Sequence, residues 1–331
     1  MLRLIAAVLA AAGTALAQPS LQDLAMPDAR VLFGANLERL RETKLAGILW
    51  SRISGWYPQQ AARLQAAGFD PLRDLSEVLV AAPAGLSRQH ALLLARGALS
   101  QADLSSLYAA DVAHREAFAG GEIITWEKQK EAFALALLGD GLIIAGAPSS
   151  VRGAIARRAG PQAPAELRRK AARLSAQYDA WGVSIVPVAE MLAQTPQSEL
   201  TGLLRGGVLE AVEQVSGGLR AGAELDLTLN SVSRTGQDAA RLADALRFFA
   251  TLAQSRRPGA PPLIKDLSVD GRTMSLSLAM AESELEGLLR VAGFGRRANP
   301  APPKPEEAGA PPAASPSDRE ASKAPQPKPP Q

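Results

Sequence analysis

The chain of 331 residues contains no cysteine. It can therefore form no disulfide, supply no thiolate nucleophile and carry no lipid on an N-terminal cysteine. A chain of this length can bury a large core, so it needs no covalent cross-link to be stable. In an oxidising compartment, the lack of cysteine also prevents mispairing.

Histidine and aromatic residues are also scarce. His90 and His114 are the only histidines, and histidine is the most frequent general base and metal ligand in proteins. We expect both as exposed polar side chains, His90 at the start of a strand and His114 in a loop. Aromatic residues make up only 4% of the chain, so the core must consist mainly of Leu, Ala, Val and Ile.

Motifs that would indicate an enzyme are missing. The chain has no Gly-Lys pair for a P-loop and no G-x-S-x-G or S-x-x-K pattern. We therefore predict no catalytic, cofactor-binding or metal-binding residue and favour a protein that is not an enzyme. A hydrolase that uses the carboxylates of Asp70, Asp74 or Asp140 stays open as an alternative, although we interpret Asp74 as the cap of a short helix.

The net charge of +3 is too small to indicate a nucleic-acid partner. Seven basic residues nevertheless lie between Arg152 and Arg173, where only Glu166 opposes them. One interpretation is contact with an anionic membrane or cell-wall surface; the other, which we favour, is a solvated helical face. The residues predicted for such a contact are Arg157, Arg158, Arg168, Arg169 and Lys170.

The N-terminus has the three parts of a secretory signal peptide. Arg3 precedes an unbroken apolar run from Leu4 to Ala12, and Ala15-Leu16-Ala17 offers small residues to a signal peptidase. The run is too short for a membrane span, which needs about 20 apolar residues. We expect residues 1–17 to be removed and the mature protein to be soluble, in the periplasm or outside the cell.

The C-terminal segment, residues 298–331, holds 11 of the 24 prolines and no Val, Ile, Leu, Met or aromatic residue. Such a composition cannot bury enough apolar surface to offset the entropy of ordering. We predict a disordered, proline-rich tail there.

Between these termini, strands and helices alternate in two similar successions. Asp140-Gly141 and Asp270-Gly271 each predict a tight hairpin between two strands, and the residues from 165 to 177 and from 237 to 254 have helical spacing. We read the stretch from Leu219 to Val232 as one half-buried strand, with Leu225, Leu227 and Leu229 on one face and Asp226, Thr228 and Asn230 on the other.

These patterns predict an α+β fold of two related units, each an antiparallel sheet with helices packed on one face. Unit 1 covers residues 26–160, a basic helical linker covers residues 161–177, and unit 2 covers residues 178–294. The whole chain resembles uncharacterised exported bacterial proteins built from duplicated α+β domains. The resemblance lies in the strand from Val31 to Ala35, the turn Gly68-Phe69-Asp70-Pro71 with Asp74-Leu75, and the Asp140-Gly141 hairpin; it implies no established chemistry.

An aromatic cluster adds one candidate binding surface. Trp50, Trp56 and Tyr57 lie within eight residues. Trp56 continues the apolar stripe of its helix and belongs in the core, whereas Trp50 and Tyr57 share a second face that could bind a partner. Taken together, the sequence favours an exported, non-catalytic binding or structural module, whose partner would be an envelope protein or an anionic surface. A carrier of an apolar ligand stays open as a further alternative.

Overall fold

The computed structural model describes residues 19–56, 62, 64–83, 91–97, 114–128, 131–193, 209–255, 263–281 and 284. The predicted leader, the proline-rich tail, Tyr57 and His90 lie outside the described residues.

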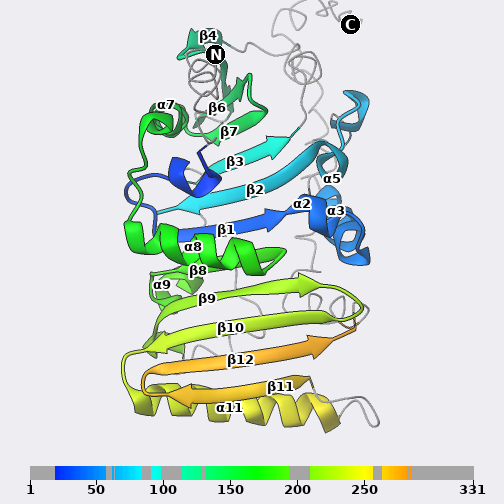
Figure 1. The fold of residues 1–331 in the computed structure, drawn as a ribbon, viewed down its shortest axis with the longest axis vertical. Coiled ribbons are helices and arrows are strands. Elements are labelled where there is room, and N and C mark those ends of the chain that lie inside the picture. The colour runs from blue at the N-terminus through cyan, green and yellow to red at the C-terminus, as the bar shows by residue number, and fades with distance from the viewer. Residues whose placement is uncertain are drawn as a thin grey trace, which may run out of the picture. The chain divides into compact units, whose positions relative to one another are not determined.

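The fold is α+β, with one large antiparallel sheet and a few helices (Figure 1). Seven strands form its first half: β1 (Val31–Asn36), β2 (Leu75–Ala82), β3 (Leu92–Gly97), β4 (His114–Phe118), β5 (Gly121–Lys128), β6 (Glu131–Leu138) and β7 (Leu142–Gly146). Five strands form the second half: β8 (Ala180–Ser184), β9 (Val212–Ala221), β10 (Leu225–Ser233), β11 (Ile264–Asp270) and β12 (Thr273–Met280).

The two halves share this one sheet. Its twelve strands follow the order β11-β12-β10-β9-β8-β1-β2-β3-β7-β6-β5-β4, and β1 pairs antiparallel with β8. The expectation of a separate sheet in each unit is therefore corrected to a continuous sheet. The sequence gives no sign of this joint, because β1 and β8 are far apart along the chain and either could have been an edge strand.

The prediction of a tight hairpin at each of the two Asp-Gly pairs is confirmed. Gly141 joins β6 to β7 with φ 75° and Gly271 joins β11 to β12 with φ 53°, a backbone conformation that costs glycine little. Two local expectations were wrong. The residues from 219 to 232 belong to two strands, β9 and β10, that a turn at residues 222–224 separates, and His114 begins β4 instead of lying in a loop.

The helices that accompany the sheet include η1 (Leu21–Leu24), α2 (Leu37–Leu40), α3 (Lys44–Trp56), α5 (Pro71–Asp74), α7 (Pro148–Ala156), η2 (Arg157–Ala159), α8 (Ala165–Gln177), α9 (Val188–Ala193), η3 (Leu209–Ala211) and α11 (Gly236–Ser255). The helical predictions for α8 and α11 are confirmed. The stretch expected as a linker contains α8, whose Leu167, Ala171 and Leu174 are buried against the sheet.

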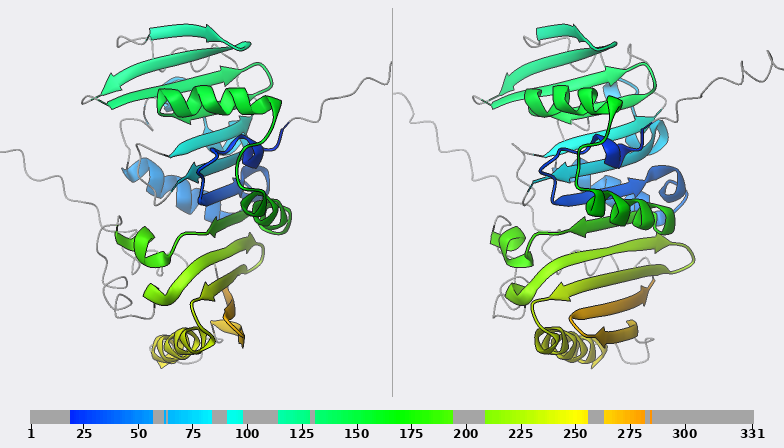
Figure 2. Two further views of the ribbon diagram at one scale, coloured as in Figure 1. Left: turned by 90° about the vertical axis from the view of Figure 1, so that its left-hand side faces the viewer. Right: turned by 60° about the vertical axis from the view of Figure 1, so that its left-hand side comes forward.

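Described helices lie on both faces of the first half of the sheet, whereas β10, β11 and β12 of the second half are covered by a described helix on one face only (Figure 2). On the face that we call the α8 face, η1, α7 and α8 bury the largest apolar cluster, mostly over the first half. On the opposite face, the α11 face, α11 packs on β10, β11 and β12 through Leu242, Ala243 and Leu246. Helices α2, α3 and α5 also contribute to apolar clusters on the α11 face. On the α8 face, α8 contacts β8 and β9, but no described helix lies on β10, β12 and β11.

Candidate functional site

The α8 face of β9, β10, β12 and β11 carries small polar side chains in two rows. Side chains alternate between faces along a strand, so the residues between Leu225, Leu227 and Leu229 point away from α11. Strand pairing aligns them with polar residues of the neighbouring strands. One row consists of Ser216, Asn230, Ser275 and Ser268, and the other of Gly218, Thr228, Ser277 and Asp266. We call these eight residues the polar face.

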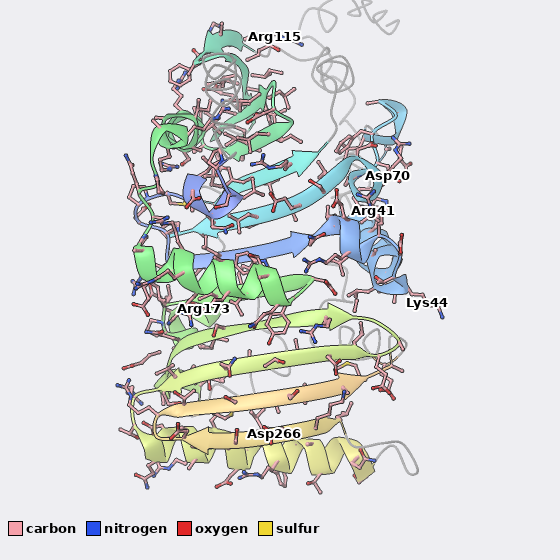
Figure 3. All side chains as sticks on the ribbon, viewed as in Figure 1. Arg41, Lys44, Asp70, Arg115, Arg173 and Asp266 are labelled. Atoms are coloured by element: carbon pink, nitrogen blue, oxygen red, sulfur yellow. The ribbon has the colours of Figure 1, made fainter. Side chains whose placement is uncertain are left out.

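The polar face is open to solvent. Ser268 and Asp266 are exposed and the side chains of the three middle strands are half-buried, Gly218 excepted. Figures 1 and 3 show no described helix in front of β10, β12 and β11, and Figure 3 labels Asp266 on the edge strand. Within the face, the Ser275 hydroxyl donates to Asn230 Oδ1 at 2.8 Å. This surface therefore offers both donors and acceptors to a flat partner.

Charged groups surround the polar face and pair with one another. Lys265 Nζ lies 2.6 Å from Asp226 Oδ1 and 3.9 Å from Glu224 Oε2; the hydrogen bond to Asp226 raises the pKa of Lys265. At the border with α8, the Tyr178 ring fills the space above Gly218. The Arg220 guanidinium lies 5.9 Å from the centre of that ring, a cation–π geometry.

The five basic residues predicted for an anionic surface do not form one free patch. Arg157 is buried at 6% exposure and its Nε donates to the Leu24 carbonyl at 2.9 Å. Burial lowers the pKa of Arg157, although Asp28 partly opposes this effect. Arg158 pairs with Asp140 at 3.0 Å. A buried guanidinium cannot reach a membrane or polymer, so Arg157 is removed from that candidate surface.

The other three residues lie on α8. Arg168 pairs with Asp23 at 2.8 Å, and Lys170 contacts Glu166 at 3.0 Å and Gln214 at 2.7 Å. Arg169 is exposed. Together with Arg96, which donates to the Pro19 carbonyl at 2.8 Å, Arg157 and Arg168 fasten the segment around η1 to the body. These arginines therefore act within the fold, a role that the sequence pattern did not distinguish from a surface role.

The aromatic candidates are only partly described. Trp50 is a half-buried residue of α3, whereas Tyr57 lies beyond the end of that helix and outside the described residues. Large apolar side chains that are clearly exposed occur elsewhere: Phe248 at 66% and Leu252 at 43% on α11, and Phe33 at 37% and Leu93 at 43% on the sheet. The sequence analysis missed these because their spacing is that of core residues.

The carboxylates considered for acid–base chemistry have structural partners. Asp70 caps α5 by accepting from the Leu72 amide at 3.0 Å. Asp74, which we expected as that cap, instead accepts from the Asp70 amide at 2.8 Å and pairs with Arg73 at 2.6 Å. The hydrogen bond from Arg73 lowers the pKa of Asp74, which is opposite to the shift that a general acid needs.

Two hollows in the described part of the chain bear on ligand binding; one is shallow and the other is small. One of about 570 Å³ lies open along the β4–β5 hairpin and is lined only by residues 115–122. The other, about 120 Å³, lies between the sheet and the helices on the α8 face, where Leu21, Ser175 and Trp181 are among its lining residues. Sites for small ligands usually measure about 300 Å³ or more, so the second hollow is too small for a ligand-sized molecule.

None of the described helices is both long and apolar enough to cross a membrane. In the described residues, no group of three or more His, Asp or Glu side chains comes close enough to hold a metal ion.

Comparison with known proteins relates the fold, but not the sequence, to a solved structure. Crystal form III of TP0453 matches with a TM-score of 0.54 at 11% identity, over 82% of this chain and 98% of that chain. Crystal form I of TP0453 matches with a TM-score of 0.52 at 13% identity, over 83% and 98%. No protein-family model matches the chain, and no curated protein matches it either. At such identities the likeness concerns the fold alone.

Proposed function

We propose that this chain is an exported, non-catalytic binding or structural module of the cell envelope, which presents the polar face of its sheet to a partner. The observation that carries the proposal is that no described helix covers the α8 face of β10, β12 and β11. An antiparallel sheet can leave one face in water, but here that face is a wide, ordered array of hydrogen-bonding groups.

Export is part of the proposal. Its support is the leader pattern of residues 1–17 together with the absence of cysteine. Expressed with its leader, the protein should be recovered outside the cytoplasm with Gln18 as its first residue. A mature protein that keeps Met1 would contradict export.

The two alternatives receive less support from the described residues. A carboxylate-dependent hydrolase would need a carboxyl group with a raised pKa, whereas Asp70 and Asp74 are engaged in capping α5 and pairing with Arg73. Asp140 pairs with Arg158. A carrier would need a ligand-sized cavity, and the hollow behind α8 is only about 120 Å³.

Site-directed photo-crosslinking in the native envelope tests the binding role. A photoreactive side chain at Ser277 faces the open surface, and one at Ser231 points into the opposite, buried side, where Ser231 is 2% exposed. A specific cross-linked product from position 277 and none from position 231 is the expected result. Equal amounts of cross-linked product from both positions, or no product from either, would contradict the proposed binding role.

We also propose that the chain arose by duplication of one α+β unit, and that residues 26–160 and residues 178–294 are its two copies. Counted outward from the β1–β8 pair, the strand orders are β1-β2-β3-β7-β6 and β8-β9-β10-β12-β11. In each half, three strands that follow one another along the chain lie side by side. The second strand of a later hairpin, β7 in the first half and β12 in the second, then pairs with the third of them, β3 or β10. β4 and β5 extend the first half only.

An experimental structure tests the duplication. Rotation of one half onto the other should superpose these five pairs of strands. Strand pairing aligns Leu93 with Phe33 in the first half and Leu229 with Gly182 in the second, so the same rotation should place Leu93 on Leu229. A different strand order or direction would show that the resemblance between the halves is accidental.

A further inference from the structure

We infer that the polar face binds an uncharged, polyhydroxylated polymer, that is, a neutral glycan chain lying flat across β9, β10, β12 and β11. The inference rests on the proposed function and names the chemical class of its partner. It is argued from the charge, the geometry and the border of that face.

The charge distribution favours an uncharged partner. The three middle strands contribute Ser216, Thr228, Asn230, Ser275 and Ser277 but no ionisable group to the two rows, and Asp266 stands only on the edge strand. The basic group nearest the edge, Lys265, is already paired with Asp226 at 2.6 Å. An anionic partner would lose water over the two rows without gaining a counter-charge within them, because Arg220 stands at their border; a neutral partner would match them.

The geometry suits a repeating chain of hydroxyl groups. Neighbouring strands lie about 4.8 Å apart, so the first row places a hydroxyl or amide group on each of the four strands at regular steps. The second row places a hydroxyl or carboxylate group on three of them, because Gly218 has no side chain. Hydroxyl and amide side chains both donate and accept hydrogen bonds, as sugar hydroxyls do. A partner that crosses the strands would therefore meet a suitable group at each strand, which a compact small molecule could not do.

The border of the face adds a guanidinium group, held over a tyrosine ring, that can donate to a polymer's hydroxyl groups. Tyr178 follows α8 and its ring lies above Gly218, the first position of the second row. The Arg220 guanidinium lies over the ring, 5.9 Å from its centre, and its Nη2 lies 3.1 Å from the Gln177 carbonyl. Arg220 is exposed, and its N–H groups can donate hydrogen bonds to the hydroxyl groups of a polymer at this border.

Native-gel affinity electrophoresis of the full mature chain tests this inference. The probes are hydroxyethyl cellulose, which is neutral, and carboxymethyl cellulose, which has the same backbone and negative charge. The neutral polymer should retard the protein, and the anionic polymer should retard it less. The variant Thr228→Val with Ser277→Ala removes two hydroxyl groups and should bind the neutral polymer about tenfold more weakly or worse.

Thr251→Val is the matched control, because Thr251 lies on α11, which packs on the other face of the sheet. It should bind like the unaltered protein, and thermal unfolding should show that all variants are folded. No retardation by the neutral polymer, equal retardation of the double variant, or stronger retardation by the anionic polymer would each overturn the inference. If Ser277 cross-links to an envelope protein while neither polymer binds, the binding role stands and the glycan inference falls.

Discussion

Phe33 of β1 lies directly opposite Gly182 of β8, and its ring occupies the space that a side chain at position 182 would need. The next pair along the same two strands repeats this arrangement on the other face, where the Trp181 ring fills the space beside Gly34. A Cβ at Gly182 would lie 2.6 Å from Phe33 Cδ1, and one at Gly34 would lie 2.5 Å from Trp181 Cε2. The joint between the halves is therefore closed by one aromatic ring on each face.

Substitution at this joint should weaken the fold. Gly34→Val and Gly182→Val each force an aromatic ring out of its position and should lower the free energy of unfolding by about 1–3 kcal/mol. Gly139→Ala is the control, because nothing lies within 4 Å of the added Cβ, and it should change stability by less than about 0.5 kcal/mol. Urea unfolding measures all three; a joint variant as stable as the control would show that β1 and β8 are not packed in this way.

A second prediction concerns Arg157, which the sequence offered as a surface residue. Arg157→Ala leaves the buried Leu24 carbonyl without its donor and opens a cavity, so it should cost about 2–4 kcal/mol. Arg157→Met keeps most of the volume and should cost less. Arg169→Ala, on an exposed position of α8, should be nearly neutral. If the alanine variants at 157 and 169 are equally stable by urea unfolding, Arg157 does not anchor the segment around η1.

A third prediction concerns pH. Hydrogen bonding from Arg73 lowers the pKa of Asp74 below its ordinary value of 3.8, so the ionised form stabilises the folded state. This stabilisation is fully present above about pH 3.8 and is lost as the pH falls through the lowered pKa. Asp74→Asn should be less stable than the unaltered protein at pH 7, and the difference should shrink in acid.

Arg73→Gln is the matched variant, because it removes the arginine whose hydrogen bond contributes most to the lowered pKa of Asp74. Its unfolding free energy, measured between pH 7 and pH 2, should lose part of the same acid dependence. An Asp74→Asn variant whose deficit stays constant down to pH 2 would contradict the assigned pKa direction.

The sequence predicted those features of the fold that depend on residues close together along the chain. The hairpins at Gly141 and Gly271 and the helices α8 and α11 follow from local turn chemistry and from helical spacing. The turn at residues 222–224 was missed because Ala223 and Glu224 continue the alternation of apolar and polar residues into β10.

The remaining features depend on contacts between distant segments. The pairing of β1 with β8 joins one edge strand of each half. No turn residue or hydrophobic spacing near either strand indicates that these two edges pair. The polar side of β10 was predicted from alternation, but its extension into rows with Ser216 and Ser275 requires the strand register. Arg157 looked like its neighbours because charge patterning does not show which arginine is buried.

The central claim is that α11 covers one face of β10, β12 and β11 while the other face, the α8 face, stays open. Because the chain has no cysteine, single Ser→Cys variants report on each face without interference. Ser277→Cys and Ser268→Cys point to the open face, whereas Ser231→Cys and Ser233→Cys occupy buried positions, 2% and 0% exposed. The rate of maleimide labelling of the folded protein is the deciding measurement: fast labelling at 277 and 268 with protection at 231 and 233 is the predicted result, and protection at 277 equal to that at 231 would contradict the account.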